Sequence, residues 1–143
     1  MSACTFFGHR ECFGLDDAVL RSAIEELIKL EVDSFYVGNQ GNFDSMVYRC
    51  LKQLRRIYPQ IRVSVVWAYL PEENMEWEDL SDAMYPEIEG HPKYAIERRN
   101  RWMIHASDYC LCYINHTWGG AYKFACMAKR RNLTVINLGR GAL

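Results

Sequence analysis

Short apolar runs alternate along this chain with stretches in which apolar residues recur every three or four positions. The short runs contain β-branched and aromatic residues, as buried strands do, whereas the longer stretches have the period of amphipathic helices. The pattern predicts five strands, at residues 4–7, 34–37, 61–67, 109–114 and 134–138. It predicts four helices between them: one opened by Asp16 and Asp17, one capped by Asn42 or Asp44, one from Lys93 to Ala106, and one from Gly120 to Arg131.

Strands that alternate with helices form a parallel sheet covered on both faces, because right-handed crossovers place the helices there. The expected fold is therefore α/β, a Rossmann-like three-layer sandwich with a mainly parallel five-stranded sheet and helices on both faces. With 143 residues, of which 50% are hydrophobic, the chain suits one domain spanning 1–143. In such a fold a ligand binds beyond the carboxyl ends of the strands, where the strand order reverses.

The charge balance of the chain gives no long-range attraction for nucleic acid or for an anionic membrane. The net charge is -1, so we expect no nucleic-acid partner and no membrane partner. A local basic patch that includes Arg98, Arg99, Arg101 and residues 129–131 is the alternative that would allow DNA binding. The first residues lack the cationic and apolar segments of a signal peptide, and no apolar run reaches membrane-spanning length, which favours a cytoplasmic protein.

The six cysteines lie mostly within predicted strands and helices, so we expect buried thiols rather than a disulfide scaffold. Cys110 and Cys112 would share one face of a strand, but no second Cys or His pair has the spacing to complete a zinc site. We therefore expect no metal and no cofactor. His91, His105 and His116 show no spacing that pairs them with a nucleophile.

Glycine and polar residues follow three of the predicted strands. The segments are Gly8-His9-Arg10, Gly38-Asn39-Gln40-Gly41-Asn42 and Asn115-His116-Thr117-Trp118-Gly119-Gly120. Glycine lets backbone N–H groups approach a ligand closely, and a helix start adds a partial positive charge, which together suit phosphate or carboxylate. A tight turn explains any one of these loops, so it is their shared position at strand ends that predicts an anion-binding cleft.

A structural and a ligand-binding interpretation both apply to the arginine of the third predicted helix. Arg99 has apolar Ile96 and Met103 as helical neighbours, and a buried cation needs an anion. That anion is a ligand phosphate in one interpretation, and Asp108 or Glu97 in the other.

The strand-end side chains have the same two interpretations. His9 and Arg10 either contact ribose and phosphate beside the loop after the fourth strand, or cap a turn and pair with Glu11. Asp44 either caps a helix or binds ribose hydroxyls. Trp118 has a ring face on which a base can stack.

Four segments occur in a particular order: 6–10, 37–44, 99–103 followed by Ser107-Asp108, and 118–121. This order resembles the SLOG superfamily, which includes the LOG phosphoribohydrolases, the DprA proteins and small YpsA-like proteins of unknown role, the last being the nearest in kind. The resemblance covers nearly the whole chain and implies a Rossmann-like sheet, a homodimer and a nucleotide-type ligand. The candidate ligand-binding residues are Gly8, His9, Arg10, Gly38, Asn39, Gly41, Asp44, Arg99, Trp118, Gly119, Gly120 and Ala121.

The chain departs from the LOG pattern at two positions. LOG enzymes carry an arginine-lysine pair and later a P-G-G-x-G-T-x-x-E segment, and they cleave nucleoside monophosphates to a base and ribose phosphate. Here Arg99 matches the arginine, but Asn100 stands in place of the lysine and Cys126 in place of the glutamate. Because cysteine cannot act as the carboxylate that such a hydrolysis needs, the sequence favours a nucleotide-binding or sensing module.

Two alternative functions stay open. A LOG-like phosphoribohydrolase would need a relocated carboxylate, for which Asp44 and Glu97 are the candidates. A protein-interaction module would use the acidic, aromatic segment 72–89, which we expect to be a loop or short helix over the strand ends, either a solvated connection or a lid over the ligand.

Overall fold

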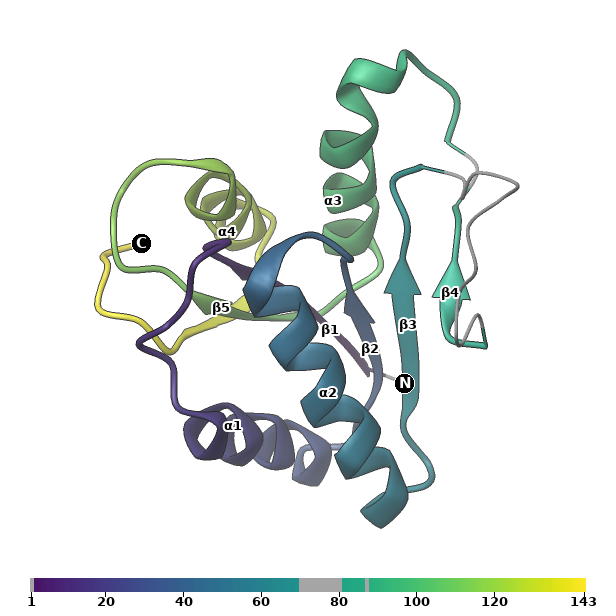
Figure 1. Cartoon of the computed structure of the whole chain (residues 1–143), viewed down its shortest axis with the longest axis vertical. Helices are drawn as coiled ribbons and strands as arrows, with labels where there is room; N and C mark the ends of the chain where they lie inside the picture. Colours follow the sequence, from purple (N-terminus) through teal and green to yellow (C-terminus); the bar gives the residue numbers. More distant parts are fainter. Residues whose placement is uncertain (1, 70–80, 87) are drawn as a thin grey trace.

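Six parallel strands form the central sheet, in the order β4-β3-β2-β1-β5-β6 (Figure 1). The computed structural model describes residues 2–69, 81–86 and 88–143. The strands are β1 (Ser2–Gly8), β2 (Val32–Val37), β3 (Arg62–Val66), β4 (Ala83–Met84), β5 (Tyr109–Tyr113) and β6 (Thr134–Asn137). The helices are α1 (Asp17–Lys29), α2 (Gly41–Ile57), α3 (Ala95–His105) and α4 (Gly120–Arg130), with a 3-10 turn η1 (Pro92–Tyr94) leading into α3. The predicted α/β class is confirmed.

The sixth strand is the difference from the predicted sheet. Ala83 and Met84 pair in parallel with Val65 and Val66 at the sheet edge, in a stretch that the sequence predicts to be a loop or short helix. Two residues are too few to produce an alternating pattern, so the strand leaves no periodic signal in the sequence. Residues 72–80 and 87 of the predicted acidic, aromatic segment 72–89 lie outside the described residues.

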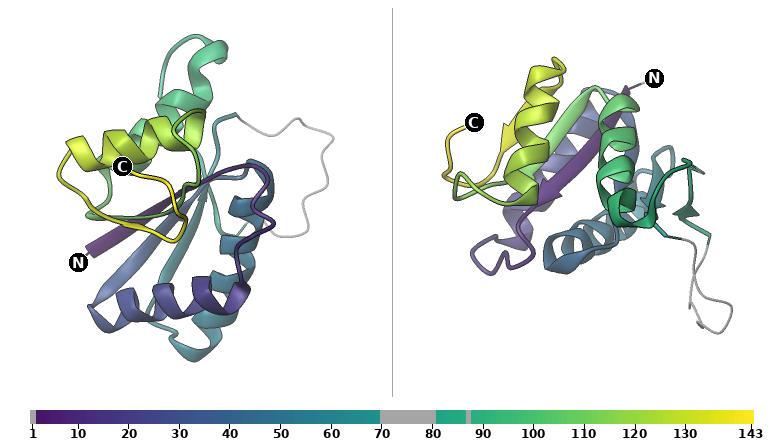
Figure 2. Two further views of the ribbon diagram at one scale, coloured as in Figure 1. Left: turned by 90° about the vertical axis from the view of Figure 1, so that its left-hand side faces the viewer. Right: turned by 90° about the horizontal axis from the view of Figure 1, so that it is seen from above.

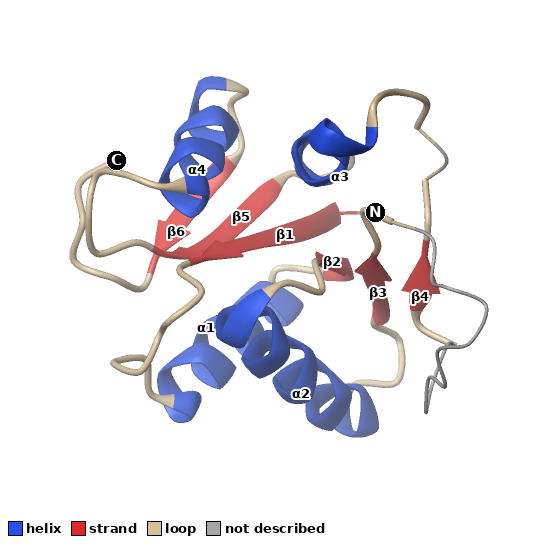
Figure 3. Ribbon diagram, turned by 45° about the horizontal axis from the view of Figure 1, so that its top comes forward, coloured by secondary structure: helices blue, strands red, loops and turns tan. Residues whose placement is uncertain are grey.

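Each face of the sheet carries two helices. Figure 3 shows α1 and α2 below the strands and α3 and α4 above them, and the views in Figure 2 show the same two layers. One buried cluster joins Phe6 and Phe35 to the first pair of helices, and a second joins Phe7 and Cys112 to the other pair. Because both faces are covered, the strands are rich in apolar residues, and these apolar runs predicted them in the sequence.

The strand order reverses between β1 and β5. From β1 the chain crosses to β2 and β3 on one side, and it later enters β5 and β6 on the other. Crossovers that leave a strand in opposite directions open a crevice beyond its carboxyl end. The candidate site therefore has a defined place, above the ends of β1 and β5.

The starts of α1 and α2 differ in how they are capped. Asp16 caps α1, as predicted, by accepting a hydrogen bond of 2.7 Å from the Ala18 N–H. The predicted caps of α2 are wrong, because α2 already begins at Gly41, where φ is +86° and the chain turns sharply into the helix. Asp44 instead lies within the first turn and accepts a 3.0 Å hydrogen bond from the Gln40 N–H.

Within the described residues, no helix has both the length and the apolar character that a membrane span needs.

Candidate functional site

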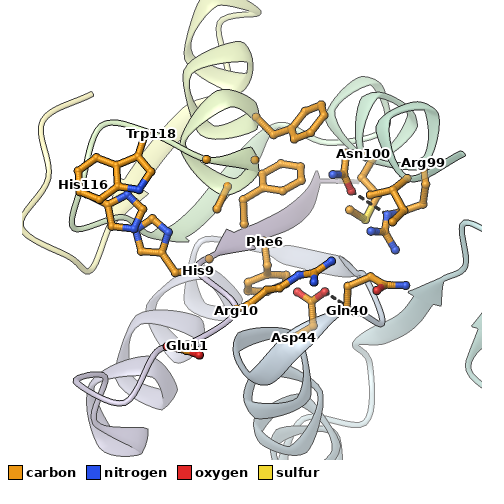
Figure 4. Close-up of a pocket in the computed structure, with 18 residues that line it drawn as sticks. Phe6, His9, Arg10, Glu11, Gln40, Asp44, Arg99, Asn100, His116 and Trp118 are labelled. Atoms are coloured by element: carbon orange, nitrogen blue, oxygen red, sulfur yellow. Dashed lines mark hydrogen bonds between the residues drawn. The ribbon is translucent and has the colours of Figure 1, made fainter. Parts of the chain in front are cut away.

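A cavity of about 630 Å³ lies at the carboxyl ends of β1 and β5 (Figure 4). Its size falls in the ordinary range for small-molecule sites. It is lined by Phe6, Phe7, Gly8, His9, Arg10, Glu11, Gln40, Asp44, Ile96, Arg99, Asn100, Met103, His116, Trp118, Gly119, Gly120, Ala121 and Phe124. The three glycine-bearing segments named from the sequence therefore all reach one space.

Most of the predicted ligand-binding residues line this cavity, and three do not. The lining members are Gly8, His9, Arg10, Asp44, Arg99, Trp118, Gly119, Gly120 and Ala121. Gly38 and Asn39 instead line a smaller adjoining cavity of about 200 Å³, which shares Asp44 with the large one. Gly41 lines neither cavity, and it lies so close to Arg10 that a Cβ at position 41 would be 3.1 Å from the Arg10 Cα.

Arg99 is the charged group buried most deeply in the cavity wall. Its side chain is on α3, and the residue is only 4% exposed. Nε donates to Asn100 Oδ1 at 2.7 Å, and Nη1 donates to the Val66 carbonyl at 3.1 Å and to Asn39 Oδ1 at 3.3 Å. Among the described residues, Nη2 has no hydrogen-bond partner. All of the acceptors are neutral oxygens, so the charge of the guanidinium is not balanced by a bonded carboxylate.

The two carboxylates predicted as alternative partners of Arg99 are engaged elsewhere. Glu97 Oε1 accepts hydrogen bonds from Lys123 at 3.0 Å and from Arg101 at 3.1 Å. Asp108 Oδ2 accepts the Ala3 N–H at 3.0 Å. The predicted structural alternative is therefore wrong: Glu97 and Arg101 pair along the outer side of α3, while Arg99 turns toward the sheet.

Gly38 allows Arg99 and Asp44 to approach the end of β2. A Cβ at this position would lie 2.8 Å from Asp44 Oδ2 and 2.9 Å from Arg99 Nη1. The side chains of Arg99 and Asp44 thus both lie next to Gly38, in space that a side chain at position 38 would fill. They form no direct ion pair among the described residues. Burial raises the pKa of Asp44 from 3.8 to about 6, while the Gln40 N–H and the charge of Arg99 oppose that rise.

Replacing Asp44 by asparagine is expected to stabilise the protein at neutral pH. Because the pKa of Asp44 is raised to about 6, the folded state binds more protons than the unfolded chain between about pH 4 and 6, and stability falls as pH rises through that window. The neutral amide of asparagine removes this loss of stability and can still accept a hydrogen bond from the Gln40 N–H. Urea unfolding of Asp44→Asn should show a gain of about 1–3 kcal/mol at pH 7.5 and little change at pH 4.

The matched control for this prediction is Asp33→Asn, a partly exposed carboxylate in β2 outside the cavity. Asp33→Asn should leave the difference in stability between pH 7.5 and pH 4 as in the unmodified protein. A loss of stability at pH 7.5 in Asp44→Asn would show instead that the carboxylate charge supports the fold.

Three aromatic rings form a stack at the opposite end of the cavity from Arg99 (Figure 4). The rings of His9 and His116 have centroids 3.7 Å apart, and those of His116 and Trp118 are 3.8 Å apart. His9 Nε2 accepts the Asn115 N–H at 3.0 Å, so this nitrogen carries no proton. Burial, and then the neighbouring His116, lower the pKa of His9, which favours the neutral form that this hydrogen bond needs.

The start of α4 opens onto the same cavity without a cap of its own. Gly119 precedes the helix at φ +92°, and the first turn carries no acidic residue. Among the described residues, no side chain accepts from the first N–H groups. The first backbone N–H groups of a helix have no partner within the helix and carry a partial positive charge. Gly119, Gly120 and Ala121 therefore present donors to the cavity that an anion would satisfy.

The glycines of the site serve different purposes. A Cβ at Gly8 would lie 2.3 Å from the ring of Phe43, so this glycine is needed for packing against α2. A Cβ at Gly120 would meet no atom of the described residues within 4 Å, and the φ of this residue is not positive. Neither packing nor backbone conformation requires glycine at position 120, where a side chain would project into open space at the helix start.

The sequence interpretation missed half of the lining residues. Gln40 and His116 lie inside the glycine-bearing loops 38–42 and 115–120, and Asn100 directly follows Arg99. Their position in the sequence is therefore a usable signal. The other missed residues are Phe6, Phe7, Glu11, Ile96, Met103 and Phe124. Most of these are apolar, and apolar residues in strands and helices are indistinguishable from core in the sequence alone.

The remaining candidate groups do not gather into a second site in the part of the chain that the structure describes. Cys126 lies on α4 and does not line the cavity. Within the described ranges, no three His, Cys, Asp or Glu side chains gather as a metal site would require. Cys110 and Cys112 are buried together in the second core cluster.

Most of the basic residues considered as a DNA-binding patch are engaged in contacts within the chain. Arg99 is buried, Arg101 pairs with Glu97, and Arg98 donates to the His91 carbonyl at 2.8 Å. At the end of α4, Lys129 donates to the Leu143 carbonyl and Arg131 contacts His105.

A scan against protein-family models finds no match for this chain, and a search of curated proteins finds no similar sequence. The case for a function therefore depends on the residues of the cavity.

Proposed function

We propose that this protein binds a nucleotide or nucleotide-derived ligand in the large cavity, as a binding or sensing module. The observation that carries the proposal is the buried Arg99 guanidinium, whose Nη2 has no partner among the described residues. A buried cation whose hydrogen bonds all go to neutral oxygens is costly, and a phosphate would supply a hydrogen-bonded anion with acceptors for Nη2.

The start of α4 supports the same ligand chemistry independently. Its uncapped N–H groups border the cavity that Arg99 lines, and helix starts of this kind bind phosphate. Arg10 adds a second guanidinium to the lining, and in the described part of the chain its side chain forms no ion pair. An anion held between α3 and α4 would thus be contacted from two different helices.

A nucleotide accounts for more of the cavity than a bare anion does. The volume of about 630 Å³ extends from Arg99 to the aromatic rings at the other end. Asp44, beside Gly38, is available to accept a ribose hydroxyl. The resemblance of four segments to the SLOG superfamily favours the same ligand class.

A thermal-shift panel tests the proposal. It should contain nucleoside monophosphates, dinucleotides, cyclic nucleotides, ribose 5-phosphate and inorganic phosphate, each at millimolar concentration. A ligand present at 100 times its Kd stabilises the folded state by about 2.7 kcal/mol, which is a shift of several degrees for a chain of this size. If no member of the panel raises the melting temperature, the proposal is wrong.

Replacing Gly120 by alanine should weaken ligand binding without harming the fold. The added methyl projects into open space beside the N–H groups of α4, where the phosphate is proposed to lie. We expect the affinity for the best nucleotide of the panel to fall by about 10-fold or more, which is about 1.4 kcal/mol. Stability should be unchanged or higher by up to about 1 kcal/mol, because alanine favours the helix over glycine.

Titration calorimetry and urea unfolding measure the two effects of Gly120→Ala separately. Arg130→Ala, at the far end of the same helix, is the control and should leave ligand affinity unchanged. Full affinity in a correctly folded Gly120→Ala protein would remove the α4 start from the binding site.

The second candidate function is hydrolysis of an N-glycosidic bond, and the observation that favours it is Asp44. This carboxyl lines the cavity, and its pKa of about 6 is close to the value that suits a general acid or base at neutral pH. Glu97 does not line the cavity. Incubation with nucleoside monophosphates should release free base if Asp44 acts in this way, and the Asp44→Asn protein should not. Equal release by both proteins would exclude Asp44 from the chemistry.

A further inference from the structure

The stack of His9, His116 and Trp118 is an ordered aromatic surface at the edge of the cavity. Neighbouring ring planes are inclined by 18° in both pairs, so the three rings lie nearly parallel. The Asn115 N–H holds His9 at the base of the stack. The indole of Trp118 is therefore oriented by two rings behind it.

The outer end of this stack is open. Trp118 is 67% exposed, although one face of its indole lies against His116, and the residue lines the cavity. The stack also leaves His116 Nδ1 buried with no hydrogen-bond partner among the described residues. Leaving a buried polar atom unpaired and a large aromatic ring exposed both cost free energy, and the core does not require either.

The other aromatic residues of the cavity cannot offer such a face. Phe6, Phe7 and Phe124 are each no more than 5% exposed, and Phe7 and Phe124 pack against one another with centroids 5.8 Å apart. Trp118 also directly precedes Gly119 at the start of α4. The exposed ring therefore belongs to the residue next to the α4 start.

We propose that the base of the nucleotide stacks on the exposed indole of Trp118, with His116 and His9 as a rigid backing, while the phosphate end of the ligand extends past the α4 start toward Arg99. This inference rests on the proposed function and deepens it, because it assigns the two ends of the ligand to the two ends of the cavity. Stacking on an aromatic face tolerates every base, so it fixes the class of ligand and leaves the choice of base to other contacts.

Titration calorimetry with AMP, GMP, CMP, UMP and ribose 5-phosphate tests this assignment. The unmodified protein should bind at least one of the nucleotides more tightly than ribose 5-phosphate, which lacks a base. Trp118→Ala should weaken nucleotide binding by about 5- to 100-fold, the range observed for the loss of one stacking ring. The same variant should leave ribose 5-phosphate binding unchanged, and Trp118→Phe should restore most of the nucleotide affinity.

Phe13→Ala is the matched control, because it removes another exposed aromatic ring, 84% exposed, that does not line the cavity. It should alter no affinity. If ribose 5-phosphate and the nucleotides bind equally well, and Trp118→Ala binds both like the unmodified protein, the stacking assignment is overturned while the phosphate site stands. If none of these compounds binds, the proposed function itself fails and the stacking assignment fails with it.

Discussion

Replacing Arg99 by glutamine is expected to lower nucleotide affinity by about 100-fold or more, which is about 2.7 kcal/mol. The guanidinium is the buried cation proposed to meet the phosphate, and removing one partner of a buried charged hydrogen bond typically costs about 2–5 kcal/mol of binding. Titration calorimetry with the best nucleotide of the panel measures this loss.

The fold of Arg99→Gln should survive. The substitution removes a buried charge, which lowers the desolvation cost, but it also weakens the bonds to Asn100 and Val66. These effects oppose one another, so urea unfolding should show a net change within about 2 kcal/mol. A lysine at this position keeps the charge without the planar fork, and Arg99→Lys should bind with intermediate affinity.

Arg98→Gln is the control for this experiment. Arg98 is the preceding arginine on the same helix, but it donates to the His91 carbonyl and does not line the large cavity. Its replacement should leave nucleotide affinity as it was. Undiminished affinity in Arg99→Gln would contradict the observation on which the proposed function rests.

Replacing Gly8 by alanine should destabilise the protein by about 3 kcal/mol, because an added methyl overpacks a filled core. The ring of Phe43, itself 1% exposed, lies 2.3 Å from the position that the new Cβ would take. Phe43 lies in the first turn of α2 and belongs to the first core cluster. The helix would therefore have to shift away from β1 to accommodate the change. A loss of this size is a large fraction of the stability of a typical domain.

Urea unfolding of Gly8→Ala and of Gly120→Ala, measured side by side, tests this prediction. Both substitutions add one methyl to a cavity-lining glycine, but only the first meets other atoms. Combining Gly8→Ala with Phe43→Leu should recover part of the loss, since the smaller side chain makes room. If Gly8→Ala is as stable as the unmodified protein, Phe43 does not constrain this position.

The glycines show how far local sequence reasoning reaches. All five candidate glycines follow strands, and sequence reasoning assigned each of them to the ligand. In the fold, Gly8 makes room for Phe43, Gly38 makes room for Arg99 and Asp44, and Gly120 faces open space. The residue type records that a side chain is excluded, but only the surrounding atoms decide whether a neighbour or a ligand takes the space.

The sequence determined the α/β class, the principal strands and the three loops that reach the cavity, because hydrophobic periodicity and glycine positions are properties of neighbouring residues. It did not reveal β4, which is too short to have a period, or the engagement of Glu97 by Lys123. The stack of His9 on His116 and the approach of Arg99 to Val66 were likewise decided by tertiary structure alone. Those contacts join residues far apart in the chain, and their geometry depends on strand order and helix packing rather than on any local pattern.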